Sequence, residues 1–87
     1  MEGRKIVGWN VRKLRAAKGL TLEDLAARAE TEPSHLAKLE RGQINATVDL
    51  LDRLAKRLGV KLRELFAEPN PGEKPPSPLK AGRRPSK

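Results

Sequence analysis

The stretch LEDLAARAETEPSHLAKLER, residues 22–41, decides how this chain folds. Its apolar residues recur at helical spacing on both sides of a short polar interruption, which is typical of two amphipathic helices in succession. They are Leu22, Leu25, Ala26 and Ala29 before the interruption, and Leu36 and Leu39 after it. Pro33 suits the first position of the second helix, where its missing N–H would be unpaired anyway, and Gly42 suits the end. We therefore predict two short helices joined by a tight corner.

Another helix is predicted on the N-terminal side of this pair, over about residues 6–18. Its apolar face consists of Val7, Val11 and Leu14. Gly19 fits the left-handed residue that often follows a helix. Thr21 is the expected N-cap of the next helix, and Asp24, three residues later, completes a capping box. The corner within residues 22–41 is thus preceded by another short connection between helices, at residues 19–21.

The C-terminal side carries a fourth helix, with Thr47 as its N-cap and Gly59 after its last turn. The apolar residues at spacings of three and four are Val48, Leu51, Leu54, Ala55 and Leu58. A short fifth helix over residues 62–66 places Val60, Leu65 and Phe66 as a lid on the others. The predicted fold class is all-α: one compact five-helix bundle, with residues 1–68 as a helix-turn-helix domain.

Residues 69–87 differ sharply in composition, because they contain six of the seven prolines and only one large aliphatic residue, Leu79. So little apolar surface cannot offset the entropy lost on ordering. We predict a disordered, Pro-rich, basic tail.

Size and charge restrict the function. A domain of this size buries only about 60% of the surface that its unfolded chain exposes, which leaves no room for a deep enzyme cavity or a small-molecule pocket. The net charge of +8 is divided evenly between residues 1–68, with 14 basic and 10 acidic side chains, and residues 69–87, with 5 and 1. A solvated surface would explain such charge, but a polyanionic partner explains it better.

Several other functions find no support in the sequence. The chain has no Cys and a single His, His35, so neither a metal site nor a cofactor is expected. Ser34 and His35 do not form a catalytic pair, since adjacent residues on a helix point in different directions. No enzyme activity is predicted. The N-terminus lacks an apolar signal region and no long apolar run exists, so we expect a cytoplasmic protein without membrane contact.

Residues 8–66 resemble the Xre, or Cro/cI-type, helix-turn-helix repressors. The stretch GWNVRKLRAAKGLTLEDLA is similar to their first two helices, HLAKLERG to the end of the third, and TVDLLDRLAKRLGVKLRELF to the fourth and fifth. The resemblance implies a lambda-repressor-like DNA-binding domain whose third helix is the recognition helix and enters the major groove of double-stranded DNA.

Carried over position by position, the resemblance implies three sets of residues. The set facing base edges is Glu32, Pro33, Ser34 and Lys38. The set facing phosphates, partly through backbone N–H groups, is Thr21, Leu22, Glu23, Arg41, Gln43, Asn45 and Thr47. The third set is an internal ion pair between Arg15 and Glu40 that fixes the recognition helix against the first helix.

Three positions depart from the family pattern. Leu22 stands where the family usually has Gln, which removes one side-chain phosphate contact. Glu30 and Thr31 replace a frequent Gly-Val in the corner, where a residue other than Gly is strained at positive φ. Glu32 brings a negative charge to the edge of the groove, where it repels phosphate unless a cytosine amino group donates to it.

The function predicted from these features is sequence-specific transcriptional regulation by a homodimer, with Leu62, Leu65 and Phe66 at the dimer interface. One alternative is a protein-interaction module, such as an antitoxin or adaptor, that keeps the fold but binds DNA weakly and has a protein partner. A second is RNA binding through the tail. One basic cluster has two open interpretations, a second DNA-facing strip or a solvated face: Arg53, Lys56, Arg57, Lys61 and Arg63.

Overall fold

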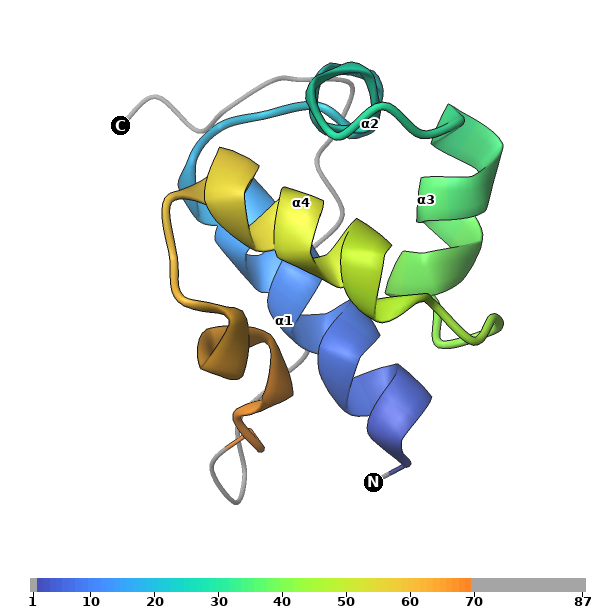
Figure 1. Ribbon diagram of the computed structural model, residues 1–87, viewed down its shortest axis with the longest axis vertical. Helices are drawn as coiled ribbons and strands as arrows, with labels where there is room; N and C mark the ends of the chain where they lie inside the picture. The colour runs from blue at the N-terminus through green and yellow to red at the C-terminus, as the bar shows by residue number, and fades with distance from the viewer. Residues whose placement is uncertain (1, 70–87) are drawn as a thin grey trace.

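The computed structural model describes residues 2–69, which form four α-helices and one 3-10 helix. They are α1 (Gly3–Ala17), α2 (Leu22–Arg28), α3 (Pro33–Glu40), α4 (Val48–Leu58) and η1 (Leu62–Phe66). Helix α4 crosses in front of α1 at the centre of the molecule, with α3 on one side, η1 on the other and α2 at the top (Figure 1). The predicted all-helical fold is confirmed, although the fifth helix is a 3-10 helix and the predicted tail from residue 70 onward lies outside the described residues.

The helix ends follow from local side-chain chemistry. The Thr21 hydroxyl accepts a hydrogen bond from the Asp24 N–H at 3.0 Å, and the Asp24 carboxylate accepts one from the Thr21 N–H at 3.3 Å. The Thr47 hydroxyl accepts from the Leu50 N–H at 3.0 Å. These bonds satisfy N–H groups that a helix start leaves unpaired. Gly59 closes α4 in the left-handed region at φ 72°.

The core is aliphatic and draws on all five elements. Its fully enclosed side chains include Val11, Leu25, Leu36, Leu39, Leu54, Leu58 and Leu65. Because α3 contributes Leu36 and Leu39 to this core, its inner face is fixed and only its outer face is left for a partner. None of the helices in residues 2–69 is long and apolar enough to cross a membrane.

Two sequence-based details are wrong. Helix α1 begins at Gly3, about one turn before the predicted start, and this extra turn buries Ile6. Val48, predicted on the buried face of α4, is 67% exposed. It is the first residue of the helix and precedes the segment that packs on the core, whose buried positions begin at Leu50.

Candidate nucleic-acid interface

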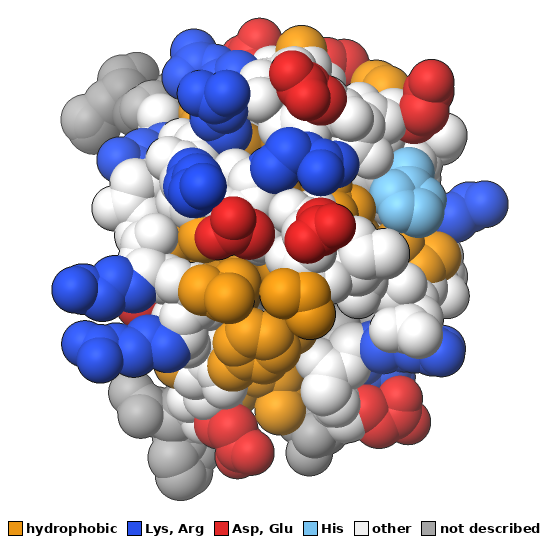
Figure 2. Space-filling view, viewed as in Figure 1, with side chains coloured by type: hydrophobic (Ala, Val, Ile, Leu, Met, Phe, Trp, Pro, Cys, Tyr) orange, Lys and Arg blue, Asp and Glu red, His pale blue; other side chains and the backbone are white. Residues whose placement is uncertain are grey.

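Helix α3 has one buried face and one exposed face. Leu36 and Leu39 are almost fully enclosed, whereas Pro33, Ser34 and Lys38 are exposed. The histidine of α3 also lies at the surface (Figure 2). Pro33 occupies the first turn of the helix, as predicted, and no side chain caps this end. The outer face of α3 therefore presents short and basic side chains on a helix whose orientation the core fixes.

An ion pair fixes the C-terminal end of α3. The Arg15 guanidinium donates to the two oxygens of the Glu40 carboxylate, from Nε at 2.7 Å and from Nη2 at 2.9 Å. Its Nη1 donates to the Leu20 carbonyl at 3.0 Å. Both side chains are at most 7% exposed. The charges are thus satisfied within the protein, and the pair joins α1 to α3 in the way the resemblance implied.

The corner before α3 is left-handed at a residue other than glycine. Glu30 has φ 59°, the one non-glycine residue with positive φ among those described. Such a conformation costs an L-residue about 1–2 kcal/mol. The Thr31 N–H donates to the Ala26 carbonyl at 2.9 Å, which closes the end of α2. The departure from Gly noted in the sequence is therefore accommodated without opening the corner, although the strain remains.

Comparison with known proteins shows to which family this helical domain belongs. The helix-turn-helix family model matches residues 11–65. The chain belongs to the helix-turn-helix family. It is 48% identical over 65 residues to an uncharacterized HTH-type transcriptional regulator, y4dJ, of Sinorhizobium fredii, a match that covers 75% of this chain and 84% of the relative. The predicted Cro/cI-type resemblance is confirmed, and DNA-binding transcriptional regulation is the function class of the chain.

Solved structures agree with this assignment. The chain is similar to the restriction-modification controller protein C.AhdI from Aeromonas hydrophila, with 38% identity and a TM-score of 0.70 over 72% of this chain and 96% of that one. It is also similar to SinR, a master regulator for biofilm formation solved in complex with DNA, with 29% identity and a TM-score of 0.66 over 70% of this chain and 98% of that one.

The helix-turn-helix residues predicted to face phosphates fall into two groups at opposite ends of α3. Thr21, Leu22 and Glu23 begin α2, which packs beside the start of α3, and the rest lie in the loop that follows α3 (Figure 1). The loop group, all exposed, is Arg41, Gln43, Asn45 and Thr47. In the α2 group, the backbone N–H of Thr21 already donates to Asp24, so it is not free for a phosphate. Of the backbone N–H groups predicted to contact phosphate at the start of α2, those of Leu22 and Glu23 remain.

The charge at the edge of this surface is mixed. Glu32 is exposed and makes no capping bond to the α3 backbone, so its carboxylate faces solvent at the start of the recognition helix. Lys38 and Arg41 are exposed nearer the other end of α3. An anion at a helix start is favoured by the helix dipole, which gives Glu32 a local structural reason besides base recognition.

The three residues predicted at the dimer interface differ in their exposure to solvent. Leu65 is completely buried in the monomer, so its side chain cannot contact a second copy, and that prediction is wrong. Leu62 is half-buried and packs on the core, while Phe66 is 49% exposed. The 3-10 turn explains the difference, since it directs Leu65 inward and leaves Phe66 at the rim. Val48, which sequence reasoning placed in the core, is the other large apolar side chain that is exposed among the described residues.

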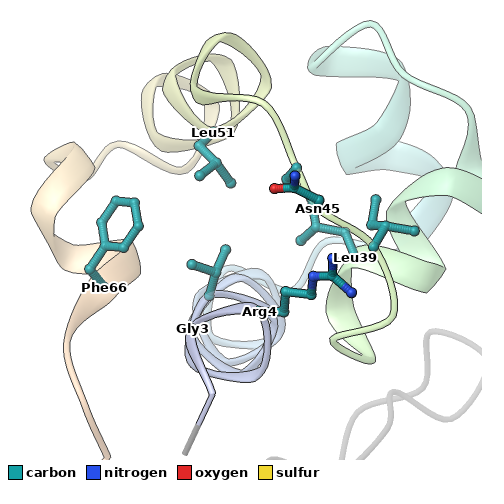
Figure 3. A pocket seen from close by; sticks show the side chains of 9 residues that line it. Gly3, Arg4, Leu39, Asn45, Leu51 and Phe66 are labelled. Carbon is teal, nitrogen blue, oxygen red and sulfur yellow. The ribbon is translucent and has the colours of Figure 1, made fainter.

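An apolar pocket of about 260 Å³ lies beside Phe66. Leu39, Leu51 and Phe66 line it from three different elements, and Arg4 and Asn45 stand at its edge (Figure 3). An apolar patch marks the same part of the surface, over the junction of α1, α4 and η1 (Figure 2). This pocket was not predicted from the sequence, because its walls come together only when the loop after α3 folds back onto α1.

Proposed function

We propose that this transcriptional regulator is a homodimer that reads a short, two-fold-symmetric operator by placing α3 of each copy in the major groove. The observation that carries the proposal is the two-faced burial of α3. Leu36 and Leu39 fix the helix in the core, and Ser34 and Lys38 stand free on the opposite side. A helix held in this way can present the same side chains to every groove it enters.

Base reading is assigned to Ser34 and Lys38. A serine hydroxyl can donate to or accept from several base edges, and a lysine ammonium can donate to a guanine edge. Glu32 and Pro33 complete the edge of this surface, with the Glu32 carboxylate suited to a cytosine amino group. Arg41 and the polar loop up to Thr47 would contact phosphates, which sets the position of α3 along the duplex without selecting a sequence.

Dimerisation is proposed because one α3 contacts too few bases to select a site. Two copies related by a two-fold axis would place their recognition helices about 34 Å apart, one turn of the duplex. We assign the contact to Val48, Phe66 and the rim of the pocket beside Phe66, because these two are the large apolar side chains that the described residues leave exposed, and exposed apolar side chains favour association. A regulator of this kind acts where the DNA is, which we take to be the cytoplasm.

Selection of bound fragments from random duplex DNA tests the proposal. A recovered palindrome, with half-sites about one helical turn apart, is the expected result. A salt titration on that fragment should then give a slope of about −4 to −5 in log affinity against log salt for each half-site, if about five phosphates are neutralised.

The alternative that the sequence left open, a protein-interaction module with weak DNA binding, predicts a different result. Glu32, exposed at the start of α3, is the observation that favours it, since a carboxylate there repels phosphate. No enriched sequence, together with an affinity for duplex DNA that hardly changes with salt, would replace our proposal with this one.

A further inference from the structure

One hydrogen bond between distant parts of the chain supports the corner of the helix-turn-helix. The Arg53 Nε–H of α4 donates to the carbonyl oxygen of Ala29, at the end of α2, at 2.8 Å. Ala29 is completely buried, and Arg53 is half-buried. The side chain therefore points into the protein. Neither sequence-based interpretation of Arg53, as part of a DNA-facing strip or of a solvated face, included this bond.

The Ala29 carbonyl needs a partner from outside its own helix. In a continuing helix it would accept from the N–H four residues later, but that residue is Pro33, which has none. A buried carbonyl without a donor is destabilising, and the C-terminal end of a helix also favours a positive charge. The Arg53 guanidinium supplies the donor and the charge together.

The residue after Ala29 is Glu30, in the left-handed conformation that a side chain disfavours. Strained backbone persists where its surroundings hold it in place. On one side the Thr31 N–H donates to the Ala26 carbonyl, and on the other Arg53 holds the peptide oxygen immediately before Glu30. The dihedral angles of this corner set the direction in which the chain enters α3 three residues later.

We propose that Arg53 is a positioning residue for DNA reading: its guanidinium holds the left-handed corner at Glu30 and so sets the angle at which α3 presents Ser34 and Lys38. The inference rests on the proposed function, since it concerns the orientation of the recognition helix. Arg53 itself touches no base. Its loss would allow α3 to sample several orientations, which lowers the affinity for the preferred sequence more than the affinity for DNA in general.

The test compares four variants with the unmodified 87-residue chain. Arg53→Met removes the donor and keeps most of the apolar stem, and Arg53→Lys keeps the charge. Glu30→Gly in the Arg53→Met background removes the strain at the corner. Lys56→Met is the matched control, because Lys56 lies on the same helix and is exposed, with only a 3.4 Å ion pair to Asp52. It removes the same charge without touching the corner.

Two measurements are made at a temperature at which every variant is folded, as judged by Trp9 fluorescence. The first is hydrogen exchange of the Thr31 amide, and the second is the ratio of affinities for the selected operator and for random duplex DNA at one salt concentration. Loss of a charged hydrogen bond corresponds to about tenfold or more in an equilibrium constant. Arg53→Met should therefore speed Thr31 exchange and lower the affinity ratio by about tenfold each. Arg53→Lys should lie between it and the wild type.

The double variant separates positioning from general destabilisation. Glycine accepts the left-handed conformation without the Arg53 bond, so Glu30→Gly should restore most of the affinity ratio that Arg53→Met loses. An Arg53→Met protein that matches Lys56→Met in both measurements would overturn the inference. A wild type that prefers no sequence at all would instead overturn the proposed function, and Thr31 exchange would still show whether Arg53 holds the corner.

Discussion

Arg15 and Glu40 are 25 residues apart in the sequence, and their side chains meet in a two-pronged ion pair at 2.7 and 2.9 Å that is sealed from solvent. A guanidinium and a carboxylate matched in this way satisfy each other's charge, so the desolvation of each is offset only while the other is present. The pair joins the last turn of α1 to the last residue of α3. Its loss should therefore affect both stability and the orientation of the recognition helix.

Removing one partner is expected to be severe. Glu40→Gln leaves the Arg15 charge buried without a counter-charge, which should lower the free energy of unfolding by about 3–5 kcal/mol. Urea unfolding followed by the fluorescence of Trp9, the single tryptophan, measures this. Asp52→Asn is the control, because it breaks an exposed pair with Lys56 and should cost less than about 1 kcal/mol. Similar losses in the two variants would contradict the prediction.

Glycine at position 8 is required by the approach of α3 to α1. A Cβ there would lie 2.5 Å from the Leu39 carbonyl oxygen and 2.6 Å from that of Glu40, and backbone atoms cannot move aside. Gly8→Ala should therefore destabilise the fold by about 1–3 kcal/mol or more. Gly3→Ala, in the same helix, meets nothing within 4 Å and should stabilise by about 0.5–1 kcal/mol. Thermal unfolding of the two variants should thus shift in opposite directions.

Apart from the start of α1, the helix boundaries and caps could be predicted because they depend on neighbours in the sequence. The capping box of Thr21 and Asp24 involves residues three apart, and Gly59 needs only its own left-handed conformation. The ion pair between Arg15 and Glu40 was implied by the family resemblance rather than by spacing. Periodicity alone misplaced Val48, since spacing does not reveal where a helix extends beyond the core.

The contacts that could not be predicted join residues far apart in the chain. Nothing in the sequence pairs Arg53 with the Ala29 carbonyl, or Asn10 with η1, because side-chain to backbone bonds across 24 or 55 residues leave no periodic signal. The same is true of the pocket beside Phe66, whose walls come from α1, α3, α4, η1 and the loop after α3. Leu65 and Phe66 are adjacent and equally apolar, and only the 3-10 geometry decides that one is buried and the other exposed.

Asn10 is predicted to hold η1 in place. Its side-chain amide donates to the Leu65 carbonyl at 3.0 Å and to the Ala67 carbonyl at 2.7 Å, and the residue is 7% exposed. Asn10→Leu keeps a similar volume but leaves both carbonyls without this donor, which should cost about 1–3 kcal/mol. Proteolysis should then cut near residue 67 before the rest of the domain unfolds. A cleavage pattern equal to that of the wild type would show that η1 is held by packing alone.

Base and phosphate contacts should respond differently to substitution. Ser34→Ala and Lys38→Ala should each reduce the affinity for the selected operator by about 1–3 kcal/mol, with a much smaller effect on random duplex DNA. Arg41→Ala should weaken binding to both DNAs alike and lower the salt slope by about one. All three residues are exposed, so the fold should be unaffected. Equal losses on both DNAs for all three variants would remove Ser34 and Lys38 as readers.

Val48 offers the cleanest test of the dimer. It is 67% exposed in the monomer, so Val48→Ser should leave the free energy of unfolding of the monomer within about 0.5 kcal/mol of the wild type. At a two-fold dimer contact the same change replaces two buried valine side chains, one from each copy. Burial of one valine side chain contributes about 1.5 kcal/mol or more. The dissociation constant from sedimentation equilibrium should therefore rise about tenfold or more.

Ala27→Ser, at an exposed position of α2, is the control and should leave the dissociation constant unchanged. If Val48→Ser also leaves it unchanged while the wild type is dimeric, the two-fold axis lies on another face, and the spacing of the half-sites would have to be derived again from that face.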